Sequence, residues 1–239
     1  MDINFVLAVV AAIIMFVFAA IVLQRFARRR HLHNLWWGIG LVMFGIGAFA
    51  EGYLVRSWNA PLFRAWYVFG AMLNAAWLGQ GTLNLLSRRR WVHYLSAALA
   101  VLSVIGIVVV WSLQLNSGAF SAGQTISSQY KAILPSSPIR VLTILLNIYG
   151  TILLIGGAIY SSYLFWRKRV LLHRVVGNIL IAAGALVIAS AGTLTLLVFG
   201  GVQPASELIA AVLMFGGFMF ASSPAAVPAA KAERSPHTA

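Results

Sequence analysis

The chain has 239 residues and a formal net charge of +13, yet 61% of its residues are hydrophobic and only 9% are charged. Soluble domains carry about 25% charged residues, so this composition excludes an ordinary soluble domain and indicates a membrane protein. The basic residues stand in short clusters between apolar blocks, which favours contact with anionic lipid over contact with nucleic acid. The sequence contains no cysteine, which excludes disulfides, iron–sulfur clusters and thiolate zinc sites.

Seven apolar blocks follow one another along the chain, and each is long enough to cross a hydrocarbon core of about 30 Å. They predict an all-α, polytopic membrane protein with seven transmembrane helices in one domain, residues 1–222. The expected helices cover approximately 3–23, 35–55, 63–86, 91–112, 139–165, 174–199 and 205–222. The first block has its charges after it rather than before it, so we expect a membrane helix there and not a secretory signal.

Two segments are expected to lie outside the helices. Residues 113–138 form a long segment rich in Ser and Gly, and loops of this length are usually functional or mobile. Residues 223–239 are rich in Ala, Pro and Ser without apolar periodicity, which predicts a disordered cytoplasmic tail.

The basic residues indicate the orientation of the chain. Thirteen of the 17 Lys and Arg residues follow the first, third, fifth and seventh blocks, and the other four lie on the opposite side. The positive-inside rule therefore places the N-terminus outside and the C-terminus in the cytoplasm of a cell membrane. At the basic ends we expect lipid phosphate to contact Arg29, Arg89, Lys168 and His173.

Two acids fall within the predicted membrane helices. Glu51 lies about 16 residues into the second block, roughly 24 Å from its cytoplasmic start, and Glu207 opens the seventh block from the same outer side. An ionisable residue in a membrane helix is a functional hypothesis by default. One interpretation is an outward-facing cavity that binds a cation, a proton or a polar ligand, lined by Glu51, Arg64, Tyr67, Asn74 and Glu207. The other interpretation is structural, with each acid paired with an arginine.

Further polar residues lie deeper in the predicted helices. Gln80 and Asn84 continue the third block toward the cytoplasm, and Asn147 and Thr151 are one turn apart in the fifth. They either form hydrogen bonds between helices or contribute to a polar path across the membrane.

No cofactor or metal is predicted. The histidines near the membrane helices, such as His33 and His93, lie beside cytoplasmic arginines and not at mid-span, where paired haem ligands would be expected. The chain contains neither a phosphate-binding GxxxxGK[ST] loop nor an HExxH metal motif.

A longer stretch carries a family resemblance. The segment HNLWWGIGLVMFGIGAFAEGYLVRSWNAPLFRAWYVFGAMLNAAWLGQGTLNLL resembles a group of uncharacterised bacterial seven-helix membrane proteins, in the acid that ends helix two, the R-x-W-Y start of helix three and the A-W-L-G-x-G-T stretch. The second half is similar to the same group. A more distant resemblance, to the seven-helix input modules of bacterial sensor kinases, implies ligand sensing, although this chain lacks a kinase or cyclase output.

These observations predict a non-enzymatic membrane protein for sensing or ligand binding, acting with the lipid bilayer and with a separate output protein. A small-solute or ion transporter is the alternative, and a membrane-embedded lipid-modifying enzyme ranks third. A nucleic-acid partner is not expected.

Overall fold

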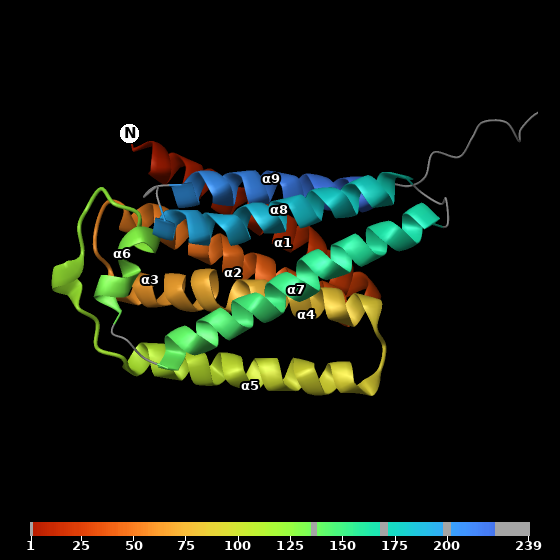
Figure 1. Cartoon of the computed structure of the whole chain (residues 1–239), viewed down its shortest axis with the longest axis horizontal. Helices are drawn as coiled ribbons and strands as arrows, with labels where there is room; N and C mark the ends of the chain where they lie inside the picture. The colour runs from red at the N-terminus through yellow and green to blue at the C-terminus, as the bar shows by residue number, and fades with distance from the viewer. Residues whose placement is uncertain (1, 135–137, 168–171, 198–201, 223–239) are drawn as a thin grey trace, which may run out of the picture.

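The computed structural model describes residues 2–134, 138–167, 172–197 and 202–222 (Figure 1). This part of the chain contains six helices that are long and apolar enough to cross a membrane. The prediction of an all-α, polytopic membrane protein is thereby confirmed. The six are α1 (Ile3–Arg29), α2 (Leu32–Leu54), α5 (Arg90–Ser112), α7 (Pro138–Arg167), α8 (Leu172–Leu197) and α9 (Val202–Ser222).

The third predicted helix is not one regular α-helix. It consists of α3 (Ala60–Ala65), the π-helix η1 (Trp66–Leu73) and α4 (Asn74–Leu86), which follow one another without a gap. The Asn59 side chain begins this segment by accepting a hydrogen bond from the Leu62 amide at 2.9 Å. A π-helical stretch widens the helix and turns side chains out of α-helical register, and such stretches are frequent at functional sites.

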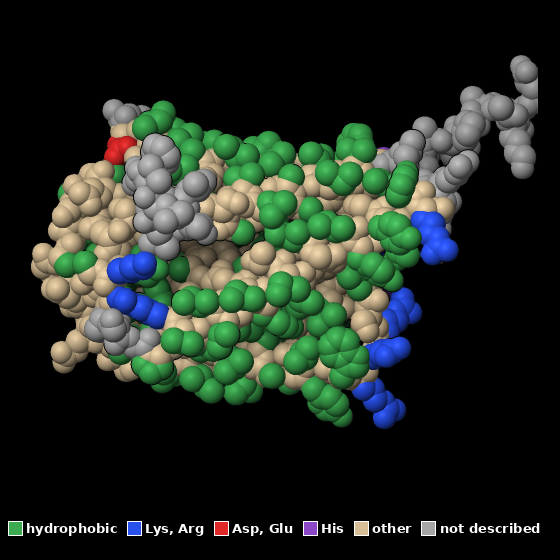
Figure 2. All heavy atoms as spheres, viewed as in Figure 1, with side chains coloured by type: hydrophobic (Ala, Val, Ile, Leu, Met, Phe, Trp, Pro, Cys, Tyr) green, Lys and Arg blue, Asp and Glu red, His purple; other side chains and the backbone are tan. Residues whose placement is uncertain are grey.

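The helices pack in antiparallel pairs. Neighbouring helices α1 and α2 pack together, as do α8 and α9, and α9 also packs on α1 (Figure 1). The segment α4 packs between α2 and α7, while α5 lies at the edge of the bundle and α7 crosses it diagonally. Figure 2 shows hydrophobic side chains along the whole length of the bundle, as expected of a surface in contact with lipid.

Glycines set the closest helix crossings. A methyl group added at Gly47 would lie 2.5 Å from the Gly70 Cα, so the absence of side chains lets η1 rest on the backbone of α2. The crossing of α4 and α7 is equally close, because Gly79 faces Gly150. Small residues at such crossings allow backbone-to-backbone packing in membranes.

The long outer segment contains helical structure that we did not predict. It holds a short 3-10 helix, η2 (Ser117–Ala119), and α6 (Ile126–Ile133). Ile126 and Ile133 of α6 are fully buried, and the Arg140 guanidinium donates to the carbonyls of Lys131 and Leu134 at the end of α6. The predicted loop is therefore partly a helix that closes the outer end of the bundle (Figure 1).

The basic ends of the helices gather at one end of the molecule. Figure 2 shows Lys and Arg side chains there, whereas α6 and the beginning of α1 lie at the opposite end. Arg29 and Arg89 are exposed and His173 is partly buried, while Lys168 lies outside the described residues. Their contact with lipid phosphate stays a prediction. The tail 223–239, predicted to be disordered, also lies outside the described residues.

Candidate functional site

A cavity of about 600 Å³ lies in the half of the bundle that is next to α6. It is bounded by α2, η1, α4, α6, α7, α8 and α9, and it reaches the surface in a hollow between α7 and α8 (Figure 2). The volume falls within the range of small-molecule sites, about 300–1,000 Å³. Its polar lining consists of Tyr67, Asn74, Ser127, Tyr130, Thr143, Asn147, Thr151, Gln203 and Glu207.

Glu51 is fully buried directly behind this lining. Its Oε1 accepts hydrogen bonds from Ser127, at 2.9 Å from the hydroxyl and 3.3 Å from the amide. The indole of Trp66 and the amide of Ile126 also face the carboxylate. Its other oxygen, Oε2, has no hydrogen-bond partner within the described part of the chain. Glu51 therefore joins α2 to α6 and keeps one acceptor unused.

Glu207 lines the cavity itself and is 6% exposed. Its Oε1 accepts a hydrogen bond from Gln203 Nε2 at 3.3 Å, one turn earlier on α9, and its Oε2 has no partner among the described residues. Ser127, which donates to Glu51, lines the same cavity. The structure thus brings the two acids of the membrane helices to the same end of one cavity.

The outer arginines do not neutralise these acids. Arg64 donates to the carbonyls of Val110 and Leu113, at 3.3 and 3.0 Å, and so caps the end of α5. The guanidinium of Arg56 lies 3.5 Å from the centre of the Phe5 ring, and that of Arg140 caps α6. Within the described ranges neither acid forms a salt bridge with an arginine, so the arrangement is not that of the structural interpretation.

Three aromatic rings form a cluster beside the acids. The centroids of Trp66 and Tyr130 are 5.8 Å apart, those of Tyr67 and Tyr130 are 6.2 Å apart, and those of Trp66 and Tyr67 are 6.3 Å apart. All three rings line the cavity. Tyr67 is held by a 3.0 Å hydrogen bond between its hydroxyl and that of Thr143. Burial raises the pKa of Tyr130, while the charge of Arg140 opposes this effect, so Tyr130 presents a neutral phenol.

The amides divide into two groups. Asn147 donates to the Ala71 carbonyl of the π-helix at 2.7 Å and to the Thr143 carbonyl at 2.8 Å. Asn74, which follows the π-helix directly, lines the cavity and forms no side-chain hydrogen bond with another described residue. Asn147 thus fixes the π-helix, whereas Asn74 is available to a ligand.

Gln80 and Asn84 face away from the cavity. Both donate to the Ser96 hydroxyl on α5, at 2.7 and 3.2 Å, and the Tyr149 hydroxyl of α7 donates to Gln80. Trp77 adds a 3.0 Å hydrogen bond to Ser103. These side chains therefore attach α5 to α4, as the helix-packing interpretation expects, and do not line the cavity.

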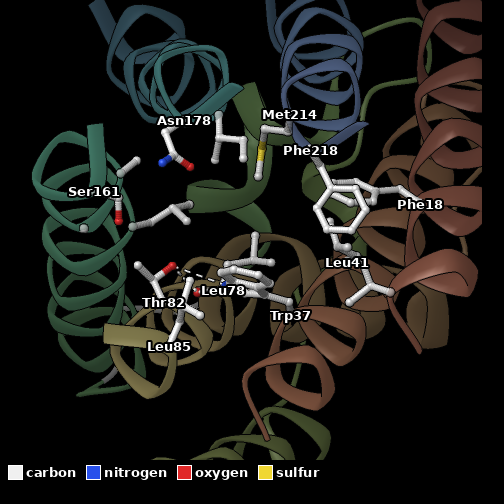
Figure 3. Close-up of a pocket in the computed structure, with 15 residues that line it drawn as sticks. Phe18, Trp37, Leu41, Leu78, Thr82, Leu85, Ser161, Asn178, Met214 and Phe218 are labelled. Carbon is white, nitrogen blue, oxygen red and sulfur yellow. Dashed lines mark hydrogen bonds between the residues drawn. The ribbon is translucent and has the colours of Figure 1, made fainter. Parts of the chain in front are cut away.

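A second, smaller pocket of about 60 Å³ lies toward the basic end (Figure 3). The Trp37 indole crosses it and donates to the Leu78 carbonyl at 3.1 Å and to the Thr82 hydroxyl at 3.3 Å. Leu78, Leu154 and Met214 line both this pocket and the outer cavity. These three side chains lie between the smaller pocket and the larger cavity, and we call them the apolar partition.

The predicted site is brought together in part. Tyr67, Asn74 and Glu207 line the cavity, Glu51 lies one layer behind Ser127, and Arg64 points to α5. Ligand binding by these residues stays a prediction. Sequence reasoning missed Trp66, although it lies within the R-x-W-Y stretch, and it missed the α6 residues Ser127 and Tyr130. The i, i+3 spacing of Ser127 and Tyr130 on a short amphipathic segment is the sequence pattern that could have placed both on one helix face.

No family model, curated protein or solved structure matches the chain. Across the described residues, no group of three or more His, Asp or Glu side chains is placed to hold a metal ion.

Proposed function

We propose that the chain is an integral protein of a bacterial cell membrane with seven spans, in which α3, η1 and α4 together make the third span. The N-terminus and α6 would face the outside, and the basic helix ends and the C-terminus would face the cytoplasm and its anionic lipids. The separation of α6 from the basic end supports this orientation.

The orientation can be tested because the chain has no cysteine. We expect a membrane-impermeant maleimide to label Ser117→Cys in intact cells and to label Arg89→Cys only after the cells are opened. The opposite pattern would reverse the proposed orientation.

The proposed function is non-enzymatic binding of a small ligand from the outer side, as in a sensor that acts on a separate output protein. The observation that carries it is the Oε2 of Glu207, which has no hydrogen-bond partner in the described part of the chain and is buried at the wall of a 600 Å³ cavity. A buried carboxylate oxygen without a donor costs about 1–3 kcal/mol or more, so a site that keeps one is suited to a ligand that supplies the donor. The resemblance to the sensory input modules agrees with this function.

Binding can be tested by thermal unfolding of the purified protein with a panel of ions and polar metabolites, since a ligand of the folded state raises the melting temperature. Thr151→Phe places a ring in the cavity, whereas Ile159→Phe changes a lipid-facing residue of the same helix outside the cavity lining. We expect a ligand-induced shift in wild type and Ile159→Phe but not in Thr151→Phe. An equal shift in all three would place the binding site elsewhere.

Transport is the second candidate, favoured by the apolar partition of Leu78, Leu154 and Met214 between the cavity and the inner pocket. A transporter needs a removable barrier between two such spaces, and a receptor does not. Liposomes that contain the wild-type protein would accumulate a labelled ligand above the level of protein-free liposomes if the protein transports it. Binding without accumulation would favour the receptor.

A further inference from the structure

The cavity also indicates which chemical class of ligand it takes. We propose that it binds a protonated organic amine, with the ammonium group at Glu207 and an apolar body along the aromatic cluster and α7. This inference rests on the proposed function and names the ligand of the same site.

The first argument is the charge of the site. Glu207 lines the cavity, Glu51 lies behind Ser127 of the same lining, and the described lining contains neither Lys nor Arg. Buried charges in proteins are normally paired, and an anionic ligand would add a third negative group. A cation is the ligand charge that offsets both acids.

The second argument is the unused acceptor of Glu207. Its Oε2 lacks a donor among the described residues, while its Oε1 accepts from Gln203. A primary or secondary ammonium group carries N–H donors that can satisfy this oxygen through a charge-assisted hydrogen bond. A quaternary ammonium group has no such donor.

The third argument is the aromatic cluster of Trp66, Tyr67 and Tyr130, whose rings contact one another and line the cavity. Faces of Trp and Tyr attract cations that lie within about 6 Å of the ring centre. Trp66 both lines the cavity and faces the Glu51 carboxylate, so the cluster connects the cavity wall to this acid.

The fourth argument concerns the apolar body of the ligand. Ile144, Ile148 and Ile152 line the cavity and yet are more than half exposed, at 58%, 52% and 65%. The α7 side of the cavity therefore continues onto the surface that faces lipid, as the hollow in Figure 2 shows. An amphipathic amine can reach the acids from this side while its apolar part stays among aliphatic side chains.

Isothermal titration of the purified, full-length protein with 2-phenylethylamine at neutral pH tests the inference. Two probes are matched controls, because 2-phenylethanol keeps the ring without the charge and the N,N,N-trimethyl derivative keeps the charge without an N–H. We expect both to bind at least 10-fold more weakly than the amine. We also expect at least 10-fold weaker amine binding by Glu207→Gln, with no change in Ile159→Phe.

Each outcome discriminates. Equal binding of the alcohol would overturn the requirement for charge, and equal binding of the trimethyl derivative would overturn the requirement for N–H donors, while either result would retain a ligand-binding cavity. A melting-temperature shift with Na⁺ and no amine binding would overturn the organic ligand but leave the proposed function intact. If Glu207→Gln fails to fold, Tyr130→Leu is used in its place. We expect this variant to bind the amine at least 3-fold more weakly than wild type. Unchanged binding would refute the contribution of the aromatic cluster.

Discussion

Replacing Gly150 by Ala tests whether backbone contact between α7 and α4 determines the stability of the bundle. An added methyl group would lie 2.2 Å from the carbonyl carbon and oxygen of Ala75 and 2.5 Å from the amide nitrogen of Ala76. These are backbone atoms that cannot rotate away, so the two helices must separate. Overpacking typically costs about 1–3 kcal/mol, and the helical preference of Ala over Gly returns about 0.5–1 kcal/mol.

Because the obstruction is backbone, we expect the upper end of that cost and a net loss of about 2 kcal/mol for Gly150→Ala. A chain of this length changes its melting temperature by about 2–4 °C per kcal/mol, so the expected decrease is about 4–8 °C. Thermal unfolding in detergent measures it.

Gly156→Ala is the matched control on the same helix, since a methyl group there would meet no atom within 4 Å. We expect this variant to melt at or slightly above the wild-type temperature. If the two variants melt at the same temperature, the close crossing of α4 and α7 does not stabilise the protein and the reasoning is refuted.

Three further substitutions separate structure from binding. Asn147→Leu leaves the Ala71 carbonyl of the π-helix without its donor, so unfolding in detergent should show a loss of about 1–3 kcal/mol; unchanged stability would contradict this role. Gln80→Leu removes the hydrogen bond to Ser96 and should lower the melting temperature while amine affinity stays at the wild-type value, whereas weaker binding would place Gln80 in the site. Arg64→Leu releases the carbonyls at the end of α5, so limited proteolysis should cut the segment after α5 faster than in wild type, and an unchanged rate would contradict the capping role.

The long apolar helices could be predicted because a membrane span needs only length and hydrophobicity. The composite helix of α3, η1 and α4 could not, since the change from α to π register depends on contacts made by other segments. Gly70 rests on Gly47 of α2, and the Ala71 carbonyl accepts from Asn147 of α7. Neither partner is adjacent in the sequence.

The candidate site shows the same limit. Membrane depth grouped Glu51 with Glu207, and in the structure Ser127, which donates to Glu51, lines the cavity that Glu207 also lines. Depth alone does not say which way a side chain points, so Arg64 was included although its guanidinium faces α5. The helix α6 was missed because eight residues within a Ser- and Gly-rich segment become helical only through burial of Ile126 and Ile133.

Three arginines, Arg56, Arg64 and Arg140, lie at the same end of the bundle as α6 and could have been used to pair the acids. The structure instead places their guanidinium groups on a ring and on helix-terminal carbonyls. Two buried acids therefore stay near each other with an unused oxygen each. Uncompensated groups of this kind lower stability and persist where function needs them. A cationic ligand would supply the missing charge only while it is bound. Its binding would therefore change the stability and the shape of the half of the bundle next to α6.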